Sequence, residues 1–407
     1  MKILEIARRL VTGRNFSNPA TNVPAPTSQN RSAAKPPRFI AFYLPQFHPI
    51  RENDQWWGRG FTEWRNVTRA VPLFPGHHQP QIPADLGFYD LRLAESRIAQ
   101  AELAKAHGID GFCYWHYWFN GRRLLERPFN EVLKGGEPDF PFCLAWANEP
   151  WARNWLGRNQ DVLAAQSYSK ADDGRHSAWL TDAFADRRYL RVGDQPVFLV
   201  YHPAHHPNID RFTSQLRDAA TARGLGDPYL IAINSHSSAD FRPLGFDANL
   251  KFEPQLGALP RALDDTLGPE AFMEANRTLG LEECGFRVYD YRRARDLMQR
   301  FATPRPAIPC VLVGFDNSPR RGQKGIILID NSPAAFADAL ETAVRANLVE
   351  MPENELIFIN AWNEWAEGNH LEPDVVNGLK HLEALLQVKN RFSVRLKRAT
   401  SSCRPGR

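Results

Sequence analysis

The stretch Leu356-Ile-Phe-Ile-Asn-Ala-Trp362 is a short apolar run that opens directly into the polar motif Asn363-Glu-Trp-Ala-Glu-Gly368. Seven earlier runs are similarly apolar and β-rich, and several are nearly continuous, as expected of strands that are buried on both faces. They are Arg38–Leu44, Ile109–Trp118, Phe140–Ala147, Pro196–Tyr201, Tyr229–Asn234, Phe246–Phe252 and Ile308–Phe315. The eight runs indicate the strands of an α/β protein.

Helical patterns separate these runs. The predicted helices are Leu93–His107, Ile209–Arg223, Tyr289–Phe301, Ser332–Leu348 and Leu371–Val388. A strand followed by a helix, about eight times over, favours a (β/α)8 TIM barrel. A doubly wound open sheet is the alternative fold, but it normally has a glycine-rich phosphate turn after its first strand, and none is visible here.

The formal net charge of the 407 residues is +4, and it is unevenly distributed. Residues 1–38 contain seven Lys or Arg and one Glu, and residues 389–407 contain seven Lys or Arg and no acid, so the body between them is acidic. An acidic body argues against nucleic acid as a partner. We expect a flexible basic N-terminal extension (1–37, an amphipathic segment and a linker), a barrel domain (38–388) and a basic tail (389–407).

The first ten residues carry charges where a signal peptide needs an apolar core, and no apolar stretch approaches the length of about 18 residues that spans a membrane. The two basic ends suit a contact with a membrane surface or a partner, and for the amphipathic start the alternative is a peripheral helix without such a role. The five cysteines are odd in number and form no CxxC pair, which is typical of a reducing compartment. We therefore expect a cytoplasmic protein, and the sequence leaves its oligomeric state open.

Common cofactor motifs do not occur in the sequence: there is no Walker loop, GxGxxG, HExxH or GxSxG, and no Asp-x-Asp pair. The histidine doublets His77-His78 and His205-His206 lack the spacing with an acid that a metal site needs. We expect neither a cofactor nor a metal.

Two carboxylates, Glu364 and Glu367, lie three residues apart just beyond the last predicted strand and among tryptophans. In a barrel, active residues follow the carboxyl ends of the strands. Glycosidic bond cleavage uses a pair of carboxylates of which one holds a proton and the other is ionised. The alternative is a pair of acids at the start of a helix, where the dipole favours them. We predict that Glu364 and Glu367 are catalytic.

A further carboxylate, Glu149, follows the third predicted strand in the sequence Asn148-Glu-Pro-Trp151. Asn-Glu-Pro at the end of a strand resembles the acid/base position of many retaining barrel glycosidases. On that model Glu149 is the acid/base and Glu364 the nucleophile. The alternative is that Glu149 only binds sugar hydroxyls or anchors its loop.

Aromatic and polar side chains gather at the predicted strand ends, and ten of the eleven tryptophans lie there or in the loops that follow. Aromatic faces pack on sugar rings, and indole N–H groups bond sugar hydroxyls. For Trp115 and Trp146 burial in the core is an equal alternative, and His202 and Glu253 are weaker candidates. The predicted substrate-binding residues are Tyr43, Gln46, His48, Trp57, Glu63, Trp64, Trp115, His116, Trp118, Trp146, Asn148, Glu149, Trp151, Asp316, Asn363 and Trp365.

Four segments resemble the WbsX-like family, which is similar to glycoside hydrolase family 99, the endo-α-1,2-mannosidases. These segments are Ile40–Pro49, Trp57–Trp64, Gly108–Trp118 and Asn363–Gly368. The resemblance covers roughly residues 38–375 and leaves the basic ends outside.

The resemblance implies roles for the paired carboxylates. Glu364 would remove the proton from the sugar 2-hydroxyl, whose oxygen attacks C1 to give an epoxide-like intermediate with net retention. Glu367 would protonate the leaving oxygen and then activate water, and Glu149 would bind substrate. The chain departs from the family's usual Asn-Glu-Asn-Trp at Asn148-Glu-Pro-Trp151.

These observations predict a retaining glycoside hydrolase that acts on an α-linked bacterial polysaccharide, with residues 38–388 as its catalytic domain. One alternative is a glycosyltransferase in the biosynthesis of a cell-surface polysaccharide such as O-antigen or capsule. The other is a non-catalytic glycan-binding protein. The sugar, the linkage and the choice between endo and exo action stay open.

Overall fold

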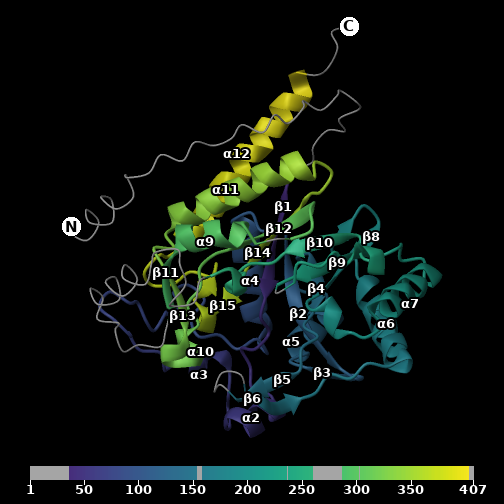
Figure 1. Cartoon of the computed structure of the whole chain (residues 1–407), viewed down its shortest axis with the longest axis horizontal. Coiled ribbons are helices and arrows are strands. Elements are labelled where there is room, and N and C mark those ends of the chain that lie inside the picture. The colour runs from purple at the N-terminus through teal and green to yellow at the C-terminus, as the bar shows by residue number, and fades with distance from the viewer. Residues whose placement is uncertain (1–35, 154–157, 236, 260–286, 302, 403–407) are drawn as a thin grey trace. The chain divides into compact units, whose positions relative to one another are not determined.

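Eight parallel strands form a closed barrel in the computed structural model, which describes residues 36–402 apart from 154–157, 236, 260–286 and 302 (Figure 1). The strands are β1 (Arg38–Tyr43), β2 (Gly111–Phe119), β4 (Phe142–Trp146), β8 (Gln195–Val200), β9 (Tyr229–Asn234), β10 (Ala248–Lys251), β12 (Ala307–Leu312) and β14 (Leu356–Asn360). Strand β1 pairs in parallel with both β14 and β2, which closes the ring. The predicted (β/α)8 barrel and its eight strands are confirmed.

Burial explains why these strands are apolar throughout. Every residue of β14 is buried, and so is every residue of β4. The barrel interior and the surrounding helices cover opposite faces of each strand, so both alternating sets of side chains need to be apolar. The predicted N-terminal segment and linker lie almost entirely outside the described residues.

Helices cover the outside of the barrel, and several begin at a side-chain cap (Figure 1). Ser169 caps α6 (Lys170–Phe184) and Ser332 caps α11 (Pro333–Glu350), each accepting a bond from a backbone N–H three residues on, as serine does at helix starts. The connection from β9 to β10 has only the 3-10 helix η3 (Arg242–Leu244) among its described residues. The main helices are α4 (Ala94–Ala106), α5 (Arg127–Gly135), α6 (Lys170–Phe184), α7 (Ile209–Ala222), α9 (Tyr291–Gln299), α11 (Pro333–Glu350) and α12 (Lys380–Ser402).

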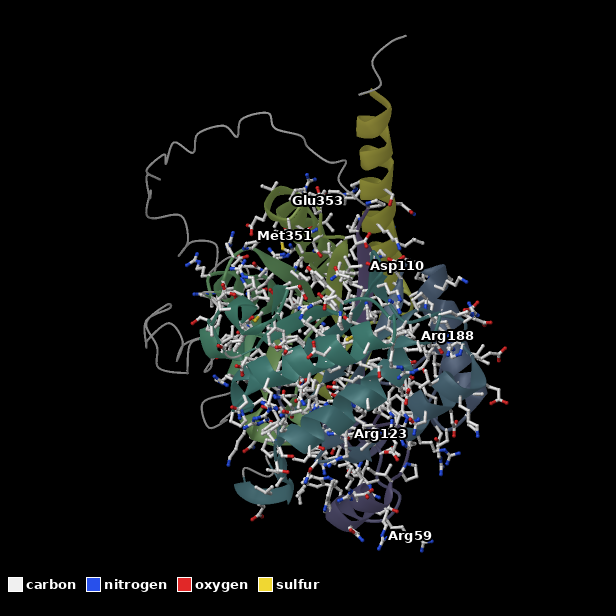
Figure 2. The ribbon with its side chains drawn as sticks, turned by 90° about the vertical axis from the view of Figure 1, so that its right-hand side faces the viewer. Arg59, Asp110, Arg123, Arg188, Met351 and Glu353 are labelled. Atoms are coloured by element: carbon white, nitrogen blue, oxygen red, sulfur yellow. The ribbon has the colours of Figure 1, made fainter. Side chains whose placement is uncertain are left out.

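The last helix differs from the prediction: α12 begins at Lys380 rather than at Leu371. The segment before it turns back onto the barrel, where the Leu371 N–H bonds to the carbonyls of Ala361 and Trp362. The helix continues to Ser402, so it crosses the boundary expected between barrel and basic tail. The Lys389 ammonium lies 2.6 Å from the Asp110 carboxylate, which Figure 2 shows beside α12.

Short elements at the carboxyl ends of the strands build the surroundings of the site. They include two antiparallel strand pairs, β5 (Trp151–Arg153) with β6 (Arg158–Ala164) and β15 (Asn363–Glu364) with β16 (Asn369–His370), and the short helices α2 (Arg51–Trp57), α3 (Glu63–Thr68) and α10 (Ser318–Arg321). None of the helices in the described part of the chain has the length and apolar character needed to cross a membrane.

Candidate active site

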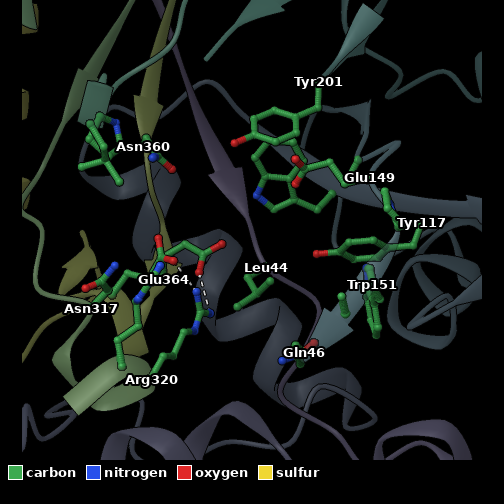
Figure 3. Close-up of a pocket in the computed structure, with 18 of the residues that line it drawn as sticks. Leu44, Gln46, Tyr117, Glu149, Trp151, Tyr201, Asn317, Arg320, Asn360 and Glu364 are labelled. Carbon is green, nitrogen blue, oxygen red and sulfur yellow. Dashed lines mark hydrogen bonds and ion pairs between the residues drawn. The ribbon is translucent and has the colours of Figure 1, made fainter. Parts of the chain in front are cut away.

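A cavity of about 500 Å³ opens at the carboxyl ends of the barrel strands (Figure 3). Seven of the residues predicted for the site line it: Gln46, Trp57, Trp115, Glu149, Trp151, Glu364 and Glu367. The cavity wall also contains side chains that were not predicted, among them Tyr117, Tyr201, Asn317, Arg320 and Asn360. The structure therefore brings the paired carboxylates and Glu149 to one cavity.

The guanidinium of Arg320 contacts three carboxylates at once. Its Nε lies 2.7 Å from Glu63 Oε1, its Nη2 lies 3.1 Å from Glu364 Oε2, and its Nη1 lies 2.5 Å from Glu367 Oε1. Arg320 is on α10, a short helix in the loop after β12, and its side chain is 9% exposed. Its planar set of donors fixes the carboxylate groups relative to one another, which a lysine ammonium could not do.

Glu63 is the one carboxylate of this cluster that does not line the cavity. Its side chain is fully buried, and it accepts bonds from Gln46 Nε2 at 2.6 Å and Asn66 Nδ2 at 3.1 Å as well as from Arg320. A buried carboxylate needs such partners because its desolvation is costly. The position suits Glu63 for orienting Arg320 and not for contacting a substrate.

Burial raises the pKa of Glu364 to about 8, and the charges of Glu367 and Glu63 act in the same direction against the lowering effect of Arg320. Burial would lower the pKa of Arg320, but its three carboxylate partners raise it well above the ordinary value. The Glu367 side chain is 26% exposed and that of Glu364 is 11% exposed. Glu364 therefore retains a proton at neutral pH, with Arg320 as a permanent cation beside it.

Backbone contacts fix the Asn363–Gly368 motif against the first strand. The Asn363 side-chain amide accepts a bond from the Leu44 N–H at 2.7 Å and donates one to the Leu44 carbonyl at 3.0 Å. Gly368 has φ +56°, and an added Cβ would lie 3.0 Å from Asp316 Cβ. The tight turn after Glu367 therefore requires glycine.

Trp365 faces away from the cavity toward a buried polar network. Its indole Nε1 donates to Glu372 Oε2 at 2.6 Å, and its ring stacks on His370 with centroids 3.7 Å apart. Glu372 also accepts bonds from the Tyr89 hydroxyl at 2.8 Å and from Gln100 Nε2 at 2.6 Å. This network supports the motif from beneath.

Glu372→Gln should reduce the dependence of stability on pH. Burial raises the pKa of Glu372 to about 7, despite the hydrogen bonds that lower it. The folded state then holds a proton that the unfolded chain loses near its ordinary pKa, so this group's contribution to stability is fully present at low pH and is lost as pH rises toward 7. The change is about 3 kcal/mol at ~1.4 kcal/mol per pKa unit.

Urea unfolding of wild type and variant at pH 5 and pH 8 measures this difference. The exposed Glu383→Gln is the matched control and should show the wild-type dependence. An unfolding free energy of Glu372→Gln that changes with pH as the wild-type value does would contradict the assignment.

Strand β2 separates three of the predicted residues, Trp115, His116 and Trp118, into two sets. Trp115 lines the cavity, as does the unpredicted Tyr117, while His116 and Trp118 point to the other face of the strand. His116 Nε2 lies 2.9 Å from His176 Nε2, and the Trp118 indole donates to Asp172. Burial lowers the pKa of His116 well below its ordinary value, so this imidazole is neutral.

The other predicted residues that do not line the cavity are also buried. The Tyr43 hydroxyl donates to Gln100, and the Trp64 indole donates to the Tyr89 carbonyl. Burial lowers the pKa of His48 to about 4. These residues, together with Glu63, His116, Trp118, Trp146, Asn148, Asp316, Asn363 and Trp365, surround the cavity residues without forming its wall.

Asp316 and Asn148 hold neighbouring loops in place, Asn148 through two bonds with the His202 backbone. Asp316 Oδ2 contacts His77 Nε2 at 2.7 Å and Gln79 Nε2 at 2.5 Å, and its backbone N–H bonds to the Glu367 carbonyl at 2.6 Å.

Trp146 is 2% exposed, in accord with the core alternative stated for it, whereas Trp115 lines the cavity.

The chain is a (β/α)8 barrel with paired carboxylates, an arginine and aromatic side chains around a cavity at the carboxyl ends of its strands. This arrangement is typical of barrel enzymes. Residues 39–385 match the family model described as Glycosyltransferase WbsX. The chain belongs to this WbsX glycosyltransferase family, and thus to a family of glycan-active enzymes.

Two curated relatives resemble the chain in sequence, and two solved structures resemble it in fold. The WxcX proteins of two strains of Xanthomonas campestris pv. campestris are each 42% identical over 358 residues, which cover 88% of this chain and 50% of each relative. The chain thus spans half the length of these relatives.

The GH99 endo-α-mannosidase from Bacteroides thetaiotaomicron in complex with Bis-Tris-propane superposes with a TM-score of 0.52 at 14% identity, covering 89% of this chain and 98% of that one. A glycoside hydrolase-like protein gives 0.52 at 13% identity, with 90% and 97% covered. The predicted resemblance to the WbsX family and to the family 99 fold is confirmed.

Proposed function

We propose that this chain is a retaining glycoside hydrolase that cleaves an α-linked bacterial polysaccharide at the Glu364/Glu367 pair. The single observation that carries the proposal is the contact of one buried guanidinium with both carboxylates in a cavity lined by aromatic rings. Such a pair holds one proton for the leaving oxygen and keeps one carboxylate ionised. Trp57, Trp115 and Trp151 offer ring faces on which sugars pack.

The roles of the two carboxylates follow the family resemblance. Glu364 is the base toward the substrate's 2-hydroxyl. Burial raises its pKa, so the ionised carboxylate of Glu364 binds protons strongly and favours removal of the hydroxyl proton. Glu367, the more exposed of the two, is the acid that protonates the leaving oxygen. A carboxylate that acts on a hydroxyl need not reach C1 itself. The two carboxylates can therefore lie only three residues apart in the sequence.

The pH dependence of kcat/KM should be bell-shaped, with an alkaline limb near pH 8. Below that pH the proton on Glu364 is available to the pair, and above it Glu364 has lost this proton, so none remains for the leaving oxygen. Initial rates across pH 4 to 10 measure this limb. The exposed Glu95→Gln is the matched control and should leave the limb unchanged. A rate that stays level through pH 9 would contradict the assignment.

The function is tested by incubating the full chain with mannose- and rhamnose-containing α-linked polysaccharides, with and without labelled sugar nucleotides. New reducing ends in the absence of sugar nucleotide, first released as the α-anomer in NMR spectra, are the expected result. Cleavage with inversion would overturn the retaining mechanism but would leave the assignment as a hydrolase in place.

The family description favours a second candidate, a glycosyltransferase that helps to build a cell-surface polysaccharide. Transfer of label from a sugar nucleotide to an acceptor glycan, without new reducing ends, would replace the hydrolase with this function. Binding of glycan without either reaction, and unaffected by substitution of Glu364 or Glu367, would identify a glycan-binding protein instead.

A further inference from the structure

Glu149, His202 and His205 converge at the wall of the cavity. One carboxylate oxygen and one ring nitrogen from each histidine all lie within 4.8 Å of one another. Glu149 Oε1 is 2.8 Å from His202 Nε2. Figure 3 shows Glu149 beside Tyr201 and Tyr117, across the cavity from Glu364 and Arg320. This cluster is therefore separate from the three carboxylates that Arg320 holds.

The fold explains why these residues meet. Strands β4 and β8 are parallel neighbours, with Trp146 paired to Val200, so the loops that carry Glu149 and His202 leave the barrel side by side. His205 ends the 3-10 helix η2 (Pro203–His205), which His202 precedes. Residues three apart align along a 3-10 helix. The two imidazole rings accordingly stack, with centroids 4.6 Å apart and planes 18° apart.

A rigid frame holds the cluster. Asn148 Nδ2 donates to the His202 carbonyl, and the His202 N–H donates to Asn148 Oδ1, both at 2.8 Å. The Tyr168 hydroxyl donates to the Asn148 carbonyl at 3.0 Å. These bonds fix the backbone of His202 against the residue that precedes Glu149. Metal and binding sites need such support because the ligand geometry must be set in advance.

We propose that Glu149, His202 and His205 bind a divalent transition-metal ion of the zinc class at the wall of the cavity. Two imidazoles and a carboxylate form a donor set that zinc takes in proteins, and three protein ligands leave a coordination position open. Glu149 lines the cavity, so the open position can accept a hydroxyl oxygen of a bound glycan. This last step rests on the proposed function, whereas the binding of the ion does not.

The histidine doublets have no acid at metal-site spacing nearby in the sequence, so the sequence predicts no metal. Here the carboxylate and the histidines come from the loops after two different strands. Adjacent strands of the barrel, rather than sequence spacing, create the site.

Metal binding is tested on the full chain without an affinity tag, freed of metal by dialysis against EDTA. Titration with ZnCl2 in a calorimeter should give one ion per chain, and Co²⁺ in its place should give visible ligand-field absorption. Glu149→Gln, His202→Gln and His205→Gln should each weaken Zn²⁺ binding at least about tenfold, since even outer partners of metal ligands are worth that much. The exposed His78→Gln is the matched control and should bind as the wild type does.

Circular dichroism first establishes that each variant is folded, and the exposed positions Glu149 and His205 are the ones that should tolerate substitution best. Absence of Zn²⁺ binding by the folded wild type, or binding by all three variants as tight as that of the wild type, would overturn the site. On a glycan that the enzyme cleaves, removal of Zn²⁺ should raise KM several-fold with little change in kcat. An unchanged KM would overturn the contact with substrate while leaving the titration result, and the hydrolase itself, intact.

Discussion

Glu364→Gln and Glu367→Gln should each lower kcat for an α-linked glycan by about 10³-fold or more, with the fold retained. The amide keeps the size of the carboxyl group but can neither take up the hydroxyl proton nor protonate the leaving oxygen. The neighbouring carboxylate cannot serve both roles, because the reaction needs a donor and an acceptor in the same cavity. Reducing-end assays measure the loss, and circular dichroism checks the fold.

Substrates with activated leaving groups separate the two roles. A leaving group of low pKa needs no protonation, so Glu367→Gln should recover much of its first-step rate on an aryl glycoside of this kind. Glu364→Gln should not recover, because the base is still missing. Recovery by Glu364→Gln alone would exchange the two roles. The exposed Glu95→Gln is a matched control. Near-normal turnover of either cavity variant on natural glycan would refute the catalytic pair.

Arg320→Met should destabilise the protein by about 3–5 kcal/mol at pH 8, the range found when one partner of a buried ion pair is removed. Three carboxylates would lose their common cation. One of the three, Glu63, is fully buried. The loss should be smaller at pH 5, where protonation removes the uncompensated charge. Removal of Arg320 also abolishes its lowering effect on the pKa of Glu364, so the alkaline limb of any residual activity should move to higher pH.

Urea unfolding at the two pH values measures the stability change, and the exposed neighbour Arg321→Met is the matched control. The double variant Glu63→Gln/Arg320→Met tests the cause, because it removes the most deeply buried carboxylate of the cluster together with the cation. It should be more stable than Arg320→Met alone at pH 8. Equal destabilisation at pH 5 and pH 8 would argue that packing, and not charge, explains the loss.

The apolar runs predicted the barrel well because its strands are buried on both faces, and such burial leaves a continuous signal in the chain. The last helix was misplaced because Leu371 is apolar for a different reason: it belongs to a segment that returns to the end of β14. A one-dimensional pattern cannot distinguish burial beneath a helix from burial in a returning loop.

The site was predicted in part. Side chains alternate along a strand, so the run Trp115-His-Tyr-Trp118 sends only half of its members to the cavity, and composition does not indicate which half. Arg320 was missed for another reason. It lies in a loop without a recognisable motif, and its importance arises from carboxylates brought together by segments distant in the chain.

The amide of Asn363, just beyond the last strand of the ring, bonds to Leu44, just beyond the first strand, and these two residues are 319 positions apart. A nascent chain on the ribosome therefore exposes the free edge of its first strand until nearly all of the barrel has been synthesised, and free strand edges promote aggregation. Glu364 and Glu367 follow the strand that seals this edge. If the proposed function holds, no partly made barrel can cleave glycan, and the onset of activity during refolding should report ring closure directly.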